Sequence, residues 1–198
     1  MKELNVMKTG TVGRIIAALI AVIGVGSFAG AQEISSVNTF DSPFLITAAG
    51  QTPDVLMVKI VAERERLDFE YKSLATPADV NQKETLLLVM GVSMKGLGSA
   101  GIRLDEEVTR VNELIEAAHS SGIPVIGMFA AGAGGRGGRD QLTDTLLAEI
   151  APRVDYLVVI RSGDRDGFLN GIAVENGIPL TYMETIVDMT RIVPAMFE

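Results

Sequence analysis

The sequence predicts an α/β fold, in which helices on both sides cover one doubly wound, mostly parallel sheet of about six strands. The first observation is three continuous apolar runs of strand length, which suit strands buried on both faces: residues 85–92, 124–130 and 155–160. The second is that segments with helical periodicity alternate with the apolar runs. We therefore expect a three-layer, flavodoxin-like or Rossmann-like domain, with a flavodoxin-like strand order of 2-1-3-4-5 plus one further strand as the first choice.

The elements begin with a short strand at 43–48 and a helix that Thr52 and Pro53 open. An alternating segment at 68–74 is typical of an edge strand, and Thr76-Pro77-Ala78-Asp79 opens a short helical turn. After these we expect, in chain order, a strand at 85–92, a loop at 93–103, a helix from 104 that stops at Gly122, a strand at 124–130, a glycine-rich loop at 132–139, a helix capped by Asp140, a strand at 155–160, a loop at 162–167, a helix that Asp166 caps and Gly177 ends, a strand at 178–183, and a last helix from about Thr185 that Pro194 kinks or ends.

The first 31 residues have the order of a secretory signal peptide. Three basic residues precede an apolar or small run from Ile15 to Phe28, and Ala29-Gly30-Ala31 gives the small-x-small cleavage pattern before Gln32. The alternative is an uncleaved membrane anchor, but the run is shorter than the ~20 residues that a spanning helix needs. We therefore predict a cleaved signal (residues 1–31), one mature α/β domain (residues 32–198), and a periplasmic or secreted location.

The mature chain is acidic and has no cysteine. Removing residues 1–31 takes away three of the 17 basic and one of the 25 acidic residues, which leaves 14 minus 24, a net charge of −10. Such a charge disfavours nucleic acid and anionic lipid, so we expect neither as a partner, and no membrane contact beyond the signal peptide. The lack of cysteine excludes disulfides, thiol nucleophiles and thiolate metal sites. The oligomeric state stays open.

The single histidine excludes two further kinds of site. His119 is expected at the end of its helix, on the amino edge of the sheet, where it places a favourable charge at the helix C-terminus. No Ser-His-Asp arrangement and no histidine metal site can then form, and we expect no cofactor. Asp164 and Asp166 match a fragment of a calcium loop, but Asp166 is better read as a helix cap.

Two segments match the G-x-G-x-x-G pattern of dinucleotide-binding loops, at 96–101 and 132–137. That fingerprint also needs an acidic residue at the end of the following strand. The following strands end in Phe129-Ala130-Ala131 and Ile160-Arg161-Ser162, without an acid, and no Walker A lysine motif is present. We therefore do not expect nucleotide binding. The loops either bind an anion through backbone N–H groups or are solvated crossovers.

Ligands of a doubly wound sheet bind beyond the carboxyl ends of the strands. Loop residues expected at that edge hold six of the 14 mature basic residues and two of the 24 acids: Lys95, Arg103, Arg136, Arg139, Arg161 and Arg165 against Asp164 and Asp166. This predicts a binding module for a small anion. Its contacts would be Lys95, Arg136 and Arg139, the backbone around Gly96, Gly98 and Gly134, and the neutral side chains of Gln51, Ser93 and Ser162.

Two other functions stay open. A hydrolase or isomerase without Cys or His chemistry would use Asp54, Asp164 or Glu184, with Asp54 and Glu184 as an acid–base pair across the edge. A protein-interaction domain would use glycine loops that become ordered on a partner. Paired carboxylates in a pocket would favour the enzyme, and a flat apolar patch would favour the interaction domain.

Several segments carry a family resemblance: PFLIT at 43–47 with AGQ at 49–51, LATP at 74–77, KGLG at 95–98 with AG at 100–101, and GD at 163–164 with DG at 166–167. They resemble a bacterial family of exported proteins that is classed as a domain of unknown function. The resemblance covers nearly the whole mature chain. It implies export and an α/β fold, and it supplies no activity and no catalytic residue.

Overall fold

The computed structural model describes residues 37–136 and 141–197, all within one compact unit that spans residues 34–198. The predicted signal peptide lies outside the described residues, as do Arg139, predicted as an anion contact, and Asp140, predicted as a helix cap. Within the described parts of the chain, no helix combines the length and the apolar character needed to cross a membrane.

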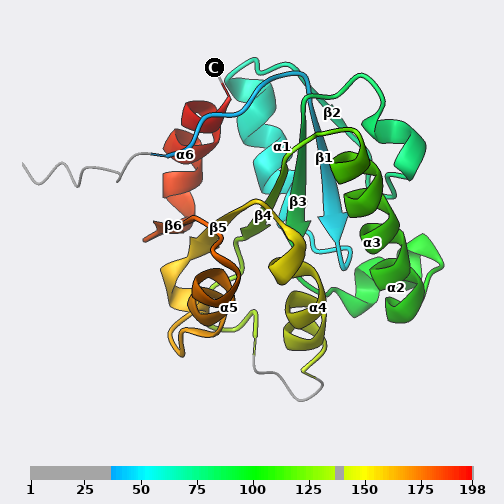
Figure 1. The fold of residues 1–198 in the computed structure, drawn as a ribbon. Helices are drawn as coiled ribbons and strands as arrows, with labels where there is room; N and C mark the ends of the chain where they lie inside the picture. The colour runs from blue at the N-terminus through cyan, green and yellow to red at the C-terminus, as the bar shows by residue number, and fades with distance from the viewer. Residues whose placement is uncertain (1–36, 137–140, 198) are drawn as a thin grey trace, which may run out of the picture. The chain divides into compact units, whose positions relative to one another are not determined.

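The sheet has six parallel strands in the order β2-β1-β3-β4-β5-β6, so the predicted fold class and strand order are confirmed (Figure 1). Central β1 pairs with β3 in the register Phe44 to Thr85 and with β2 in the register Phe44 to Phe69. The edge strand expected at 68–74 is shorter than predicted. The strand bounds are β1 Phe44–Ala49, β2 Phe69–Tyr71, β3 Thr85–Met90, β4 Val125–Phe129, β5 Tyr156–Ile160 and β6 Leu180–Met183.

Helices lie on both faces of the sheet and make the three layers that the alternating pattern predicts (Figure 1). Helices α1 and α6 pack on one face, and α3, α4 and α5 pack on the other. The helix bounds are α1 Val55–Arg64, α2 Met94–Ala100, α3 Leu104–Ser120, α4 Leu142–Ile150, α5 Phe168–Asn176 and α6 Met189–Met196, with short 3-10 turns η1 Pro77–Val80, η2 Ala151–Arg153, η3 Arg161–Gly163 and η4 Ile186–Asp188.

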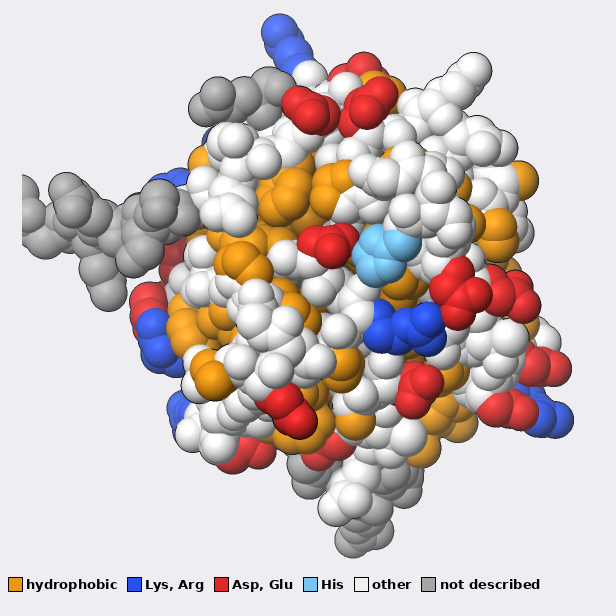
Figure 2. All heavy atoms as spheres, viewed as in Figure 1, with side chains coloured by type: hydrophobic (Ala, Val, Ile, Leu, Met, Phe, Trp, Pro, Cys, Tyr) orange, Lys and Arg blue, Asp and Glu red, His pale blue; other side chains and the backbone are white. Residues whose placement is uncertain are grey.

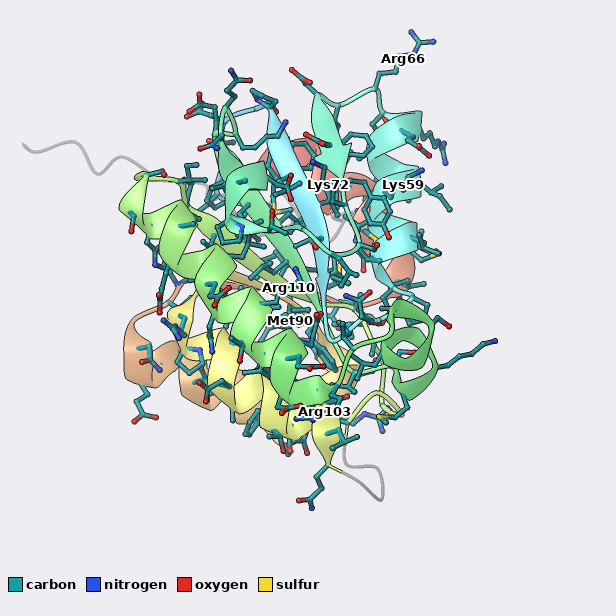
Figure 3. All side chains as sticks on the ribbon, turned by 90° about the vertical axis from the view of Figure 1, so that its right-hand side faces the viewer. Lys59, Arg66, Lys72, Met90, Arg103 and Arg110 are labelled. Carbon is teal, nitrogen blue, oxygen red and sulfur yellow. The ribbon has the colours of Figure 1, made fainter. Side chains whose placement is uncertain are left out.

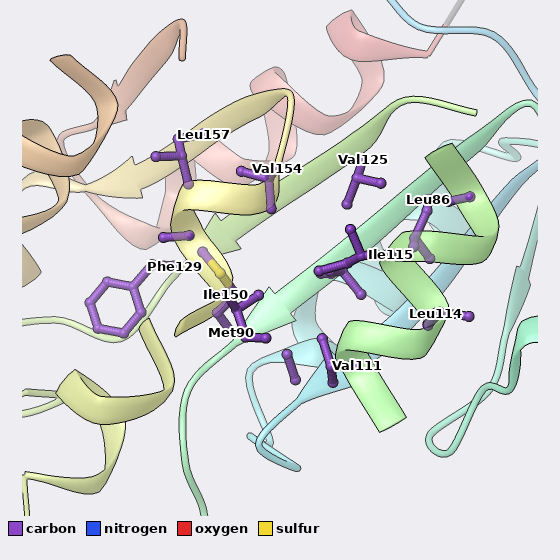
Figure 4. Close-up of a cluster of buried hydrophobic side chains, with 14 of the residues drawn as sticks. Leu86, Met90, Val111, Leu114, Ile115, Val125, Phe129, Ile150, Val154 and Leu157 are labelled. Atoms are coloured by element: carbon purple, nitrogen blue, oxygen red, sulfur yellow. The ribbon is translucent and has the colours of Figure 1, made fainter. Parts of the chain in front are cut away.

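The apolar runs form central strands because successive side chains point to opposite faces, and both faces are covered. In β3, Leu86 and Leu88 face the α3 side, whereas Leu87 and Val89 face α1 and α6. Helix α3 contributes Val111, Leu114, Ile115 and Ala118 to the first of these two cores (Figure 4). Both cores are needed, since a strand with one bare face would expose half of its apolar side chains.

Helix α2 occupies most of the segment that was predicted to be a loop at 93–103. Ser93 caps it, since its Oγ accepts the N–H of Gly96 at 3.0 Å, and Gly101 ends it in the left-handed conformation with φ +70°. Leu97 is buried and anchors the helix to the domain. The prediction was wrong because Gly96 and Gly98 lower the local helix propensity, which the cap and the buried leucine offset.

The cap of α5 also differs from the prediction. The carboxylate of Asp164, not that of Asp166, accepts the N–H groups of Leu169 and Asn170, at 2.7 and 3.1 Å. Gly167 takes the left-handed conformation between them, with φ +72°. The chain therefore turns back far enough for the earlier aspartate to reach the first turn of the helix. The predicted cap by Asp166 is present only as a longer hydrogen bond, in which its Oδ1 accepts the N–H of Phe168 at 3.4 Å.

The two ends of the described chain meet at the amino edge of the sheet. The N–H of Phe40 donates to the carbonyl of Met196 at 2.7 Å. The rings of Phe44 and Phe197 stack with centroids 3.7 Å apart, and the ring of Phe40 lies 5.4 Å from that of Tyr156. This aromatic cluster links the segment before β1 to the last residues of α6.

We expect Phe197→Ala to lower the free energy of unfolding by about 3–5 kcal/mol, because it leaves a cavity beside Phe44 in a buried position. Urea denaturation of residues 32–198 measures the change. Val174→Ala on exposed α5 is the control and should change stability by less than about 0.5 kcal/mol. Equal effects of the two substitutions would show that the aromatic cluster does not hold the chain ends.

Candidate functional site

The single histidine of the sequence lies at the amino edge of the sheet and has a structural role. His119 lies in the last turn of α3, as predicted, with its Nε2 3.0 Å from Oδ2 of Asp155. The same Oδ2 accepts the N–H of Val125, at the start of β4, at 2.8 Å. The histidine therefore tethers a helix end to a strand, and it lies on the side of the sheet opposite the loops that follow the strands.

At the carboxyl edge, the loops after β1 and β3 are in direct contact. A β-carbon on Gly50 would overlap the carbonyl oxygen of Gly91, and one on Gly96 would overlap the carbonyl oxygen of Gln51. Gly50 also has φ +92°, which glycine adopts without strain. This is the point where the chain leaves adjacent strands for opposite faces of the sheet, the usual ligand position in doubly wound folds.

A buried carboxylate supports this junction from the side of α3. Glu107 is fully buried. Its Oε1 accepts the N–H of Gly50 at 2.9 Å and the side-chain amide of Gln51 at 3.0 Å. The Arg110 guanidinium donates to both carboxylate oxygens at 2.8 Å. Glu107 thereby fixes the turn that follows β1.

Arg110 extends the same network to two other segments. It donates to the carbonyl of Ala48, near the end of β1, and to the carbonyl of Ala75, after β2, both at 2.7 Å. Figure 3 shows Arg110 directed from α3 into the interior, whereas Arg66 and Lys59 on the α1 side extend outward. The ion pair is therefore enclosed and fully hydrogen-bonded, as a buried pair requires.

Five predicted contact residues lie at or near this junction. Gln51 uses its amide on Glu107 and on the carbonyl of Ser73, at 3.0 Å each. Ser93 uses its hydroxyl to cap α2 through the N–H of Gly96. Lys95, in the first turn of α2, is exposed. Gln51, Ser93 and Gly96 thus support the loop, while Lys95 projects into solvent. Gly98 lies in the last turn of α2 and is also exposed.

A second junction links the loop after β4 to the loop after β5 through Arg136. Its Nε donates to Asp144 on α4 at 2.7 Å, and its Nη atoms donate to both carboxylate oxygens of Asp166 at 2.8 and 3.0 Å. The guanidinium lies 4.4 Å from the ring centroid of Phe168. Only 9% of the Arg136 side chain is exposed. Arg136 therefore links the two loops, and its charge is already paired.

Asp164 is a second carboxylate close to Arg136. Its side chain is fully buried and one oxygen lies 3.5 Å from the Arg136 guanidinium. It also accepts the hydroxyl of Tyr182 at 2.8 Å. Burial, with the neighbouring Asp164 carboxylate, raises the pKa of Tyr182 to about 12. Hydrogen bonding to Arg136 lowers the pKa of Asp166. Asp166 thus binds Arg136 directly, whereas Asp164 holds α5 and Tyr182 and lies close to the same guanidinium. No metal-binding group of three or more His, Cys, Asp or Glu occurs within residues 37–136 and 141–197.

The last predicted contacts, Ser162 and Gly134, lie on the two loops that Arg136 links. Ser162 is half-buried in the loop after β5, and Gly134 is exposed in the loop after β4. A β-carbon on Gly163 would overlap the carbonyl of Ala131, so the two loops are packed directly on each other. Ser162 and Gly134 therefore lie on loops of fixed relative position. Among the described residues, no hydrogen bond links Ser162 or Gly134 to Lys95.

The acid–base pair proposed for an enzyme does not form. Glu184 accepts the Nε–H of Arg161 at 2.6 Å, and Asp54 bonds to the hydroxyl of Thr52 at 3.1 Å. Strands β3, β4 and β5 separate β1 from β6, a distance of about 19 Å at the ordinary strand spacing. Each carboxylate therefore serves a local partner.

The excess of positive charge counted in the loop sequences is partly cancelled in the structure by acidic side chains that lie close by. Arg103 pairs with Asp105, Arg136 with Asp144 and Arg161 with Glu184, and none of these three acids is among the loop residues that gave the basic excess. Figure 2, which views the face of the molecule that contains His119, likewise shows carboxylates with basic side chains near several of them. Within the described chain, Lys95 and Arg165 form no ion pair.

The comparisons with known proteins give a family and no activity. A family model described as "Domain of unknown function (DUF6305)" matches residues 41–197. The chain belongs to this DUF6305 family. Neither a curated protein nor a solved structure matches the sequence. For a DUF6305 domain, function must therefore be argued from the residues themselves.

Sequence reasoning missed Glu107 and Arg110, although a signal for them is present. Glu107 falls in the buried register of α3, four residues before Val111 and seven before Leu114. A carboxylate within an apolar stripe requires a buried partner, and the arginine three residues later can supply one. Tyr182 had no such signal, because its partner Asp164 comes from a separate strand connection.

We expect Glu107→Ala to lower the free energy of unfolding by about 3–5 kcal/mol, because it leaves the Arg110 charge buried without a partner. Chemical denaturation is the measurement. The double substitution Glu107→Ala with Arg110→Met should recover part of the loss, since no charge is then stranded. Glu113→Ala, on the exposed side of α3, is the control. A cost below about 1 kcal/mol for Glu107→Ala would mean that the ion pair does not hold this edge.

Proposed function

We propose that this DUF6305 domain is exported and binds a small anionic molecule at the carboxyl edge of its sheet. The observation that carries the proposal is the direct packing of the loops at this edge. Gly50, Gly96 and Gly163 each lie where a β-carbon would overlap the backbone of a neighbouring loop, whereas Gly98 and Gly134 have no atom within 4 Å of that position and leave space above the packed loops. Loops fixed in advance bind a ligand at a lower entropic cost.

The proposed contacts divide into two groups. Lys95 and Ser162, with the backbone near Gly98 and Gly134, would touch the ligand, as would Arg139, which lies outside the described residues. Gln51, Ser93, Gly96 and Arg136 would act indirectly, because their polar groups hold the loops in place. Of the residues first expected to bind the anion, Arg136 is thus assigned to positioning.

A second candidate, a protein-interaction domain, has one observation in its favour. Leu56, Met57 and Ile60 on α1 are 47%, 47% and 56% exposed. Their spacing of three and four residues puts them side by side on the helix surface. Exposed apolar groups of this kind mark many interaction surfaces. The ligand screen below separates the candidates, because a protein-interaction surface on α1 gives no response to small anions.

We expect a small anion to raise the melting temperature of residues 32–198 by several degrees. A ligand at 100 times its Kd adds about 2.7 kcal/mol of stability. Thermal unfolding against acetate, phosphate, sulfate, sugars, amino acids and divalent cations at constant ionic strength is the measurement. Arg66→Ala, an exposed arginine on the α1 side (Figure 3), is the matched control and should leave the response intact. No response to any anion would refute the proposal.

Export predicts a mature protein that begins at Gln32. Expression of residues 1–198 in a Gram-negative host, followed by cell fractionation and mass spectrometry, tests this. The matched control replaces Ala29 and Ala31 with bulky residues, which should block cleavage and leave the longer chain bound to the membrane. Recovery of uncleaved protein from the cytoplasm would contradict export.

A further inference from the structure

The arginines at the carboxyl edge differ in how many of their guanidinium N–H donors have no acceptor within the protein. Arg136 is 9% exposed and its three nitrogens all donate to protein oxygens. Arg103 pairs with Asp105 through both Nε and Nη2. Arg161 is 54% exposed and makes one hydrogen bond within the described residues, from Nε to Glu184. Arg161 therefore keeps both Nη groups for a ligand.

The Arg161 side chain is also held in a defined orientation. Its guanidinium lies 4.1 Å from the ring centroid of Tyr182. That ring is fixed in turn, because its hydroxyl donates to buried Asp164 at 2.8 Å. Contact with one face of the guanidinium and a hydrogen bond at Nε leave both Nη groups without a hydrogen bond among the described residues, and two parallel N–H donors of a guanidinium can bind a carboxylate in bidentate fashion.

We propose that Arg161, held by Tyr182 and Glu184, is the residue that binds the anion and that its ligand is a monocarboxylate. This inference rests on the proposed function and identifies which end of the carboxyl edge, the end at β5 and β6, carries the ligand. The 3-10 turn η3 places Ser162 next to Arg161, where its half-buried hydroxyl is available as a neutral hydrogen-bond partner.

The charge of the ligand follows from Glu184. Its carboxylate is 43% exposed and lies beside Arg161, so the pair has no net charge. Repulsion between Glu184 and an incoming anion increases with the charge of that anion. A ligand with one negative charge can use the two Nη donors at a modest cost, whereas sulfate or hydrogen phosphate carries a second charge against the same carboxylate. Acetate should therefore bind more tightly than sulfate.

The experiment follows the Nε–H signals of ¹⁵N-arginine-labelled residues 32–198 by NMR during titration with sodium acetate and sodium sulfate at constant ionic strength. Arg161→Lys assigns the Arg161 signal and keeps the charge while it removes the fork. We expect the Arg161 signal to shift with acetate. In thermal unfolding, Arg161→Lys should weaken acetate binding about 10- to 100-fold, the usual range for a charge-assisted bidentate contact. Arg66→Ala, outside the proposed site, should leave it unchanged.

Glu184→Gln is the matched variant for ligand charge, because it retains a hydrogen-bond acceptor for Arg161. We expect it to strengthen sulfate binding more than acetate binding. An equal effect on both anions would refute the monocarboxylate assignment. Stabilisation by anions that survives Arg161→Lys and is lost in Lys95→Ala would overturn the role of Arg161 and leave the proposed function standing. The absence of both stabilisation and NMR shifts would overturn the two proposals together.

Discussion

The buried ion pair of Glu107 and Arg110 is the constraint on which the carboxyl edge depends. Three hydrogen bonds at 2.7–2.9 Å join it to the end of β1 and to the segment after β2: the N–H of Gly50 donates to Glu107, and Arg110 donates to the carbonyls of Ala48 and Ala75. Two more, at 2.8 Å, join Arg110 to Glu107 within α3. Since a charge left alone at this depth is strongly destabilising, the two side chains cannot separate while the domain is folded. The left-handed turn at Gly50 and Gln51 is held by this pair, and α2 packs directly on that turn.

The edge also contains its own anions at positions where doubly wound proteins bind external ones. Asp164 occupies the first turn of α5, where a phosphate or carboxylate could otherwise bind. Glu107 accepts the N–H of Gly50 in a comparable way at the end of β1. A ligand must therefore use the charges that these internal carboxylates do not satisfy. That condition disfavours Arg136 and favours groups further out, on the rim formed by Lys95 and Arg161.

How much of this the sequence could predict depends on whether the relevant interaction is local. Fold class and strand order follow from buried runs such as residues 85–92, because only a sheet covered on both faces suits them. The cap at Thr76 and the end of α5 at Gly177 depend on neighbours within a few residues and were predicted correctly. The basic edge was overestimated because acids outside its loops neutralise two of its arginines. Asp144 lies on α4, eight residues after Arg136, and the pairing of β5 with β6 brings Glu184 to Arg161.

The two edges of the sheet are therefore stabilised by different interactions. At the amino edge, Phe44 and Phe197 stack in an apolar cluster that stabilises the chain ends by burial and presents few polar groups. At the carboxyl edge, most polar groups form hydrogen bonds or ion pairs with one another. Arg161 is among those that keep donors without a protein partner. Recognition in such a site depends less on the number of basic residues than on which of them the fold leaves unsatisfied, because a paired guanidinium gains little from exchanging one carboxylate for another.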